Sequence, residues 1–195
     1  MLYTIPSLRG NNLLNKVTQG WWLGNIVTAQ SGYPFSPTLS YVSSLSGIGN
    51  PGEAFDRASY VTSDNLAAAG AIDPAATIFD KNTVIIGRPT QWFNRHMFTT
   101  PIPGYHGTVG RNVLRGPGIT NWSLSLNKNT RLTPLGEAGN IQFRAEIFNV
   151  LNHPNFAQPA TSIAGSATSL AANAGVISST ATTSRQIQFA LKVIF

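Results

Sequence analysis

The chain has 195 residues and no cysteine, which excludes disulfides, thiolate metal sites and cysteine nucleophiles. Only 10% of its residues are charged, against roughly 25% in ordinary soluble domains, although 42% are hydrophobic. No apolar run comes near the roughly 18 residues of a membrane-spanning helix. This combination is typical of transmembrane β-barrels, because alternation with polar residues dilutes their apolar ones.

The charge is uneven along the chain. Residues 1–80 carry three basic and five acidic groups, giving −2, and residues 81–195 carry ten basic and two acidic groups, giving +8, which together make the net +6. The basic residues are isolated and form neither a cluster nor a basic helix. No nucleic-acid partner is therefore expected, despite an isoelectric point of about 10.1.

The first two strands are expected near 1–6 and 20–31. The second begins with Trp21 and Trp22, whose rings suit the aromatic girdle at a membrane interface. A buried tryptophan cluster is the alternative. Gly24 is a candidate β-bulge that would shift the alternation of side chains, so the sequence leaves open which tryptophan faces outward.

Two further strands are expected near 119–132 and 140–149, joined by a tight turn at 133–139. The second of these alternates apolar residues with polar ones that include Arg144 and Glu146. An ion pair is acceptable in a polar lumen and costly on a lipid face. We therefore expect a lumen network that contains Arg144 and Glu146, together with Lys192 of the last strand.

The last strand, near 185–195, has the clearest alternation in the chain. A period of two places successive side chains on opposite faces of a strand. Eleven residues also match the roughly 9–11 that a tilted strand needs to cross a bilayer. One face is continuously apolar, and we expect it to contact outer-membrane lipid through Ile187, Phe189, Leu191, Val193 and Phe195.

The connections differ in length in a regular way. The segments 32–117 and 150–183 are long and lack sustained alternation, whereas 133–139 is short. Outer-membrane barrels place long loops outside and short turns in the periplasm. The sequence therefore predicts an all-β fold, an antiparallel transmembrane β-barrel segment of about five strands with long extracellular loops, whose last strand runs towards the periplasm. A soluble or secreted β-rich adhesion or binding module, with its strands packed in a sandwich, is the alternative.

Several short motifs follow one another along the chain in a specific order. Together with the last strand, they resemble the carboxy-terminal part of the TonB-dependent outer-membrane receptors, in particular the Oar-like group that carries a carboxypeptidase-regulatory-like domain. The resemblance covers nearly the whole chain apart from 38–80 and 157–183. The motifs are Gly20-Trp21, Thr28 to Gly32 with Pro34-Phe35, Gln91 to Asn94, Gly110 to Gly118, Phe143 to Asn149, and Asn152 to Phe156.

The resemblance implies a large plugged barrel that imports a scarce ligand with energy from an inner-membrane complex. It also implies that barrel-insertion machinery reads the last strand, with Phe195 as its terminal aromatic residue. We expect residues 1–195 to be the C-terminal portion of such a barrel domain, a fragment that relies on the remaining strands and the plug of a full-length protein.

A cationic and aromatic cluster in the long connection 32–117 is a candidate for binding an anionic ligand, because arginines pair with anions and aromatic rings attract cations. The alternative is that Gly110 to Gly118 is a structural loop whose arginines brace neighbouring loops or the inner wall. The residues expected to face the ligand are Arg88, Trp92, Arg95, Arg111 and Arg115.

No catalytic residue, metal site or cofactor is expected, and the chain is not expected to be an enzyme. No serine lies in a Gly-x-Ser-x-Gly turn. The three histidines are far apart and are expected to be ordinary loop residues. Five acidic residues lie close together in sequence without the spacing of a calcium-binding loop, and a solvated loop is expected to hold them, namely Glu53, Asp56, Asp64, Asp73 and Asp80.

Overall fold

A computed structural model describes residues 2–6, 15, 17–45, 56–132 and 139–195. The predicted turn at 133–139, apart from Gly139, and the acidic residue Glu53 lie outside these described residues. The described residues contain many strands and a few short helical segments, and none of their helices is long and apolar enough to cross a membrane. They form two compact units, which are described separately.

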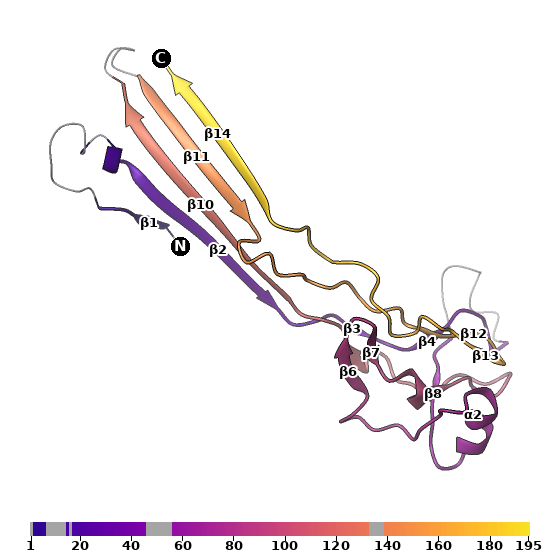
Figure 1. The fold of residues 1–195 in the computed structure, drawn as a ribbon. Helices are drawn as coiled ribbons and strands as arrows, with labels where there is room; N and C mark the ends of the chain where they lie inside the picture. The colour runs from indigo at the N-terminus through magenta and orange to yellow at the C-terminus, as the bar shows by residue number, and fades with distance from the viewer. Residues whose placement is uncertain (1, 7–14, 16, 46–55, 133–138) are drawn as a thin grey trace. The chain divides into compact units, whose positions relative to one another are not determined.

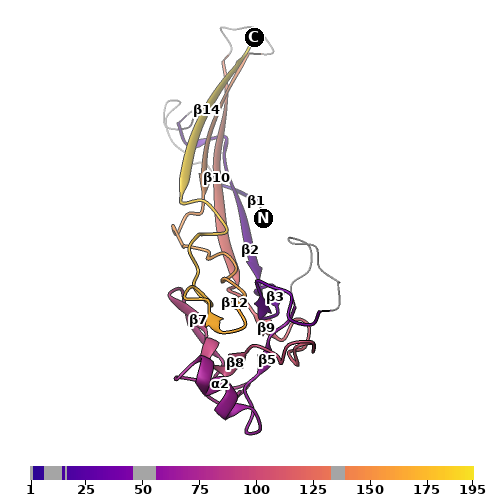
Figure 2. The same cartoon turned by 90° about the vertical axis from the view of Figure 1, so that its right-hand side faces the viewer.

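Unit 1 comprises Met1–Gln30, Ile119–Asn155 and Thr182–Phe195. It is a five-stranded antiparallel sheet in the order β1-β2-β10-β11-β14 (Figure 1). Sequential strands are therefore neighbours throughout, as in an up-and-down barrel wall. Figure 2 shows β2, β10 and β14 from the side as a single curved layer. The strands are β1 (Leu2–Thr4), β2 (Trp21–Gln30), β10 (Ile119–Arg131), β11 (Asn140–Phe148) and β14 (Gln186–Ile194).

The register of the sheet is continuous, so each side chain can be assigned to a face. β2 pairs with β10 without interruption from Trp21 opposite Lys128 to Gln30 opposite Ile119. The bulge considered at Gly24 is therefore absent from this ladder. Trp21 shares its face with the apolar residues of β11 and β14, and Trp22 lies on the opposite face. Trp21 is therefore the tryptophan on the apolar face of the sheet.

Both long connections leave the sheet from the same end. Gln30 lies opposite Ile119, and Phe148 lies opposite Gln186. The connections 31–118 and 149–185 therefore start and finish at the same end of the strands. Arg131 lies opposite Asn140 at the other end, where the chain makes its short connection. Long loops at one end and short turns at the other are the arrangement of an outer-membrane barrel.

Unit 2 comprises Ser31–Gly118 and Phe156–Ala181. The two long connections fold together, since β12 of the second pairs with β4 of the first in the sheet β13-β12-β4. The sheets β3-β9, β5-β8 and β6-β7 lie within the first connection (Figures 1 and 2). Its elements are β3 (Pro34–Phe35), β4 (Thr38–Leu39), β5 (Ser59–Tyr60), α2 (Leu66–Ile72), β6 (Ile85–Arg88), β7 (Gln91–Phe93), the 3₁₀ helix η1 (Arg95–Met97), β8 (Phe98–Thr99), β9 (Leu114–Arg115), β12 (Ser162–Ser166) and β13 (Ser169–Leu170).

Unit 2 has a hydrophobic core of its own, which the loop assignment of these segments did not foresee. Phe93 and Phe98 are almost completely buried, and their rings meet edge to face with centroids 5.8 Å apart. Leu39 and Ile163 complete the centre of the core from two other strands. Because Ile163 comes from the second connection and the other three come from the first, the core exists only when the two connections associate.

Candidate functional site

The apolar face of the sheet extends across all its long strands. In β14, Phe189 is 72% exposed and Leu191 is 68% exposed, and Ile187 and Val193 lie on the same face. The residues directly opposite them in β11 are Ile147, Ala145, Phe143 and Ile141. In β10 and β2 the same face continues with Trp122, Leu124, Leu126, Leu23 and Val27. Phe195 follows β14 and is 89% exposed. An exposed apolar surface of this extent needs an apolar environment.

Aromatic rings form a row across three strands of this face. The rings of Trp21 and Phe143 meet edge to face with centroids 6.3 Å apart, and Phe143 stacks on Phe189 at the same distance. The Lys128 ammonium lies 4.9 Å from the centre of the Trp21 ring. Both Trp21 Nε1, at 2.8 Å, and Lys128 Nζ donate hydrogen bonds to the Val17 carbonyl. Aromatic rings beside a lysine are typical of a membrane interface.

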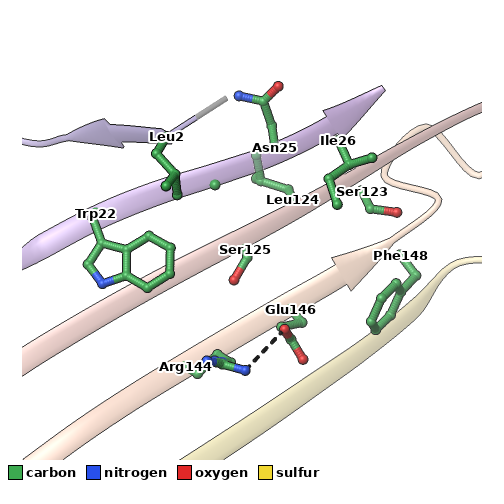
Figure 3. A pocket seen from close by; sticks show the side chains of 11 residues that line it. Leu2, Trp22, Asn25, Ile26, Ser123, Leu124, Ser125, Arg144, Glu146 and Phe148 are labelled. Carbon is green, nitrogen blue, oxygen red and sulfur yellow. Dashed lines mark ion pairs between the residues drawn. The ribbon is translucent and has the colours of Figure 1, made fainter. Parts of the chain in front are cut away.

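The opposite face carries a pocket of about 380 Å³ between β1, β2, β10 and β11 (Figure 3). The Trp22 ring lies at one side of the pocket and Phe148 at the other, with Ser125 on the strand between β2 and β11 (Figure 3). Gly24 lies opposite Ser125 and leaves room beside the Trp22 ring, since an added Cβ there would lie 3.5 Å from that ring. The pocket thus combines an aromatic wall with polar groups.

The charged groups of this pocket are paired. Arg144 Nη1 lies 3.6 Å from Glu146 Oε1, and their side chains point towards one another in Figure 3. Arg144 Nε donates a hydrogen bond of 3.0 Å to Asn127 Oδ1, whose own amide donates to Ser125 Oγ. Lys192 lies on the same face, opposite Gln142. The structure therefore brings Arg144 and Glu146 together, with Lys192 one residue pair further along the face.

Three asparagines position the chain between β11 and β14. Asn149, at a positive φ of 52°, accepts a hydrogen bond from His153 N and donates to the His153 and Thr183 carbonyls. Asn152, at φ 51°, accepts one from Arg185 N. Asn155 is 1% exposed and accepts a hydrogen bond from Thr120 N. Asparagine tolerates the left-handed conformation and can hydrogen-bond to the backbone, which explains this residue type here.

The residues expected to face a ligand lie in unit 2, and three of them also make internal hydrogen bonds. Trp92 Nε1 donates to the Arg115 carbonyl at 2.8 Å, and Arg115 Nη1 donates to the Gly32 carbonyl at 3.3 Å. Arg95 Nη1 donates to the Ala171 carbonyl at 2.8 Å. Arg88 and Arg111 are exposed. These hydrogen bonds of Trp92, Arg95 and Arg115 brace the unit.

Asp73 is buried and Asp56 is half-buried, and both are hydrogen-bonded within the unit, so a solvated loop is the wrong description for them. Asp56 Oδ2 accepts hydrogen bonds from Ser43 N at 2.6 Å and Ser44 N at 2.7 Å. Burial of the Asp56 carboxyl raises its pKa, but the hydrogen bonds from Ser44 and Ser43 lower the pKa by more. The pKa of Asp56 therefore lies below its ordinary value. Asp73 Oδ2 lies 2.5 Å from His96 Nδ1. No sequence spacing signals either contact.

No group of three or more histidine or acidic side chains in the described ranges is arranged to hold a metal ion. His96 and His106 each lie near one carboxylate, and His106 Nδ1 is 3.9 Å from Asp56 Oδ1.

The antiparallel sheet has one apolar and one polar face. Its aromatic row lies towards the end with the short connection, and the long connections leave from the other end. These features define the wall of a membrane β-barrel. A comparison with protein-family models matches residues 1–188 to the outer membrane beta barrel domain. The chain belongs to this family, and it lies in the bacterial outer membrane. The soluble-module alternative is therefore wrong. Searches of curated proteins and of solved structures found no match.

Proposed function

We propose that this chain is part of the barrel wall of a TonB-dependent, Oar-like receptor that imports a ligand across the outer membrane with energy from an inner-membrane complex. The apolar face contacts lipid, the polar face around Arg144 and Glu146 faces the lumen, and unit 2 receives the ligand outside. Five strands leave two open edges, and unpaired strand edges are not tolerated in lipid. Further strands and a plug are the proposed partners in the complete barrel.

The observation that carries this proposal is the convergence of the receptor-like motifs within unit 2. Pro34-Phe35 pairs with Leu114-Arg115 in the sheet β3-β9, and Trp92 donates its indole N–H to Arg115. Gly32 packs so closely on Gly116 that an added Cβ would lie 1.8 Å from the Gly116 carbonyl oxygen. Motifs far apart in sequence therefore build one small scaffold, as expected of residues that a receptor family shares for a structural reason.

Energised import can be tested by comparing three strains: the parent, a deletion of this gene, and a deletion of the energising inner-membrane protein. We expect at least one solute to be depleted from the medium by the parent and to persist with both deletions. Its uptake in the parent should stop when an ionophore dissipates the proton gradient. Uptake that depends on this gene but not on the energising protein would indicate passive diffusion through the barrel and would contradict the proposal.

The polar pocket offers a second test of the same proposal. Glu146→Gln removes the charge that pairs with Arg144 and retains nearly the same shape, so the barrel should still assemble. If this face lines the transport route, the rate of uptake should change while the abundance of the protein in the outer membrane does not. Gln186→Glu, at the end of β14 and outside the pocket, is the control.

A further inference from the structure

We propose that unit 2 contains a binding site for the phosphate group of a small solute, formed by Thr90, Gln91, Arg95 and His96. This inference requires only the fold of unit 2 and does not depend on energised import. The four residues line a cavity of about 240 Å³, whose opposite wall is formed by Ala172, Ala174 and Val176 of the second connection. Ligand pockets for drug-sized molecules span roughly 300–1,000 Å³, so this cavity suits a smaller group.

The two charged or titratable side chains of the cavity are held in place by groups behind them. Arg95 and His96 are consecutive in η1, which Asn94 caps by accepting a hydrogen bond from His96 N at 3.1 Å. Arg95 Nη1 is anchored on the Ala171 carbonyl. A guanidinium has five N–H donors, and this bond uses one of them. A fixed guanidinium fork is the protein group best matched to the oxygens of a phosphate or carboxylate.

The orientation of His96 selects among oxyanions. Asp73 is a carboxylate, and its Oδ1 also accepts a hydrogen bond from Ala75 N at 3.1 Å. Since a carboxylate only accepts, the His96 Nδ1 atom 2.5 Å away must carry the hydrogen. In the neutral form of the ring, Nε2 is then an acceptor. A phosphate that carries one P–OH group can donate to Nε2 and accept from Arg95 with its other oxygens, whereas a deprotonated carboxylate has no hydrogen to donate.

The segment that supplies Thr90, Gln91, Arg95 and His96 is basic. Residues 81–118 contain one lysine, four arginines and no acidic residue, which gives this segment a charge of +5. Asp73 contacts His96 of the site, and its two oxygens are already occupied by His96 and Ala75. Long connections of outer-membrane barrels lie outside the cell. The cavity is therefore placed where a solute arrives from outside the cell.

Equilibrium dialysis of radiolabelled inorganic phosphate against outer membranes that contain the protein tests the site, with membranes from the deletion strain as background. We expect saturable binding that glycerol phosphate displaces and that acetate at equal ionic strength does not. Displacement by glycerol phosphate would mean that a phosphorylated solute fits the site, and its failure would restrict the site to free phosphate. Equal displacement by acetate would overturn the role assigned to the P–OH group, and absence of saturable binding would overturn the site.

Variants locate the binding within the protein. Arg95→Gln should weaken phosphate binding about tenfold or more, because it removes a charge-assisted hydrogen-bonding group. Thr90→Val should weaken it a few-fold without touching the hydrogen bonds that hold Arg95 and His96 in place. Lys81→Gln makes the same change of charge at an exposed position away from the cavity and should have little effect. Equal losses in Arg95→Gln and Lys81→Gln, with an unchanged protease digestion pattern, would contradict a specific site.

Discussion

Asp56 illustrates how a single side chain binds several backbone groups of another segment. Its carboxylate accepts both backbone N–H groups of Ser43 and Ser44, and Ser44 Oγ donates to its other oxygen at 3.0 Å. Hydrogen bonds to a charged group contribute about 1.5–3 kcal/mol each when both partners are buried. Asp56 therefore ties the backbone at Ser43 and Ser44 to the segment that leads into β5.

The lowered pKa of Asp56 makes the stability of unit 2 depend on pH. In the folded state the pKa of the Asp56 carboxyl lies below its unfolded value of about 3.9. The ionised carboxylate therefore stabilises unit 2 fully above the unfolded pKa, and this stabilisation is lost as the pH falls through the folded pKa. Asp56→Asn should destabilise unit 2 at neutral pH by about 1–3 kcal/mol and should flatten its stability profile below pH 4. Thermal unfolding measured between pH 3 and pH 7 tests this. Asp64→Asn, at an exposed carboxylate, is the control.

Gly107 shows a second kind of residue-scale constraint, the close approach of two backbones. A Cβ at this position would lie 1.9 Å from the Arg57 carbonyl oxygen and 2.3 Å from that of Ala58. Gly107→Ala should therefore force the two segments apart and destabilise unit 2 by about 1–3 kcal/mol.

The helix α2 supplies a matched control for that substitution. An added Cβ at Gly70 meets no atom within 4 Å. Because alanine favours a helix over glycine by roughly 0.5–1 kcal/mol, Gly70→Ala should leave unit 2 as stable as before or slightly more stable. Chemical denaturation followed by protease susceptibility compares the two variants. Equal destabilisation by both substitutions would contradict backbone crowding as the cause of the effect at Gly107.

At the scale of elements, the lipid-facing assignment of β14 can be tested on the strand itself. Leu191 lies on the apolar face opposite Phe143, and Leu191→Arg should destabilise the inserted barrel by roughly 2–4 kcal/mol if the site is near the bilayer midplane. Gln188 lies on the other face, opposite Glu146, so Gln188→Arg places the same side chain beside a carboxylate and should be tolerated. Heat-modifiable migration in detergent gives the folded fraction. Full tolerance of Leu191→Arg would contradict the assignment.

The long strands were readable from sequence because each has one apolar and one polar face. Alternation in 185–195 predicts a strand, and the observed β14 spans Gln186–Ile194. The phase of β2 was not readable, since Trp21 and Trp22 are adjacent and both suit an interface. Only the ladder with β10, in which Trp21 lies opposite Lys128, fixes which ring lies on the apolar face.

The short strands of unit 2 could not be predicted in this way. Most of them are two residues long, such as β3 and β9, and two residues cannot display a period. Their partners are also distant in sequence, because β12 pairs with β4 across more than a hundred residues. The contact between His96 and Asp73 has the same origin: the fold of the unit brings the residues together, and neither belongs to a recognisable motif.

At the scale of the whole molecule, the two long connections behave as one structure rather than as two loops. Ile163 of the second connection is fully buried beside Phe93 and Phe98 of the first. Thr38 N donates to the Thr161 carbonyl at 3.0 Å, and Trp92 N donates to the Gly175 carbonyl at 2.7 Å. Each connection therefore supplies partners for backbone groups and apolar side chains of the other, and neither has a complete core alone.

This joint core predicts that damage to the second connection unfolds the first. Ile163→Ala should remove buried volume and destabilise unit 2 by about 2–5 kcal/mol. Added protease should then cleave not only within 156–181 but also within 56–118 on the cell surface, and mass spectrometry can locate the cleavage sites. Ile102→Ala, at a side chain that is 72% exposed, is the matched control and should leave the digestion pattern unchanged. Cleavage confined to 156–181 in Ile163→Ala would show that the two connections fold independently.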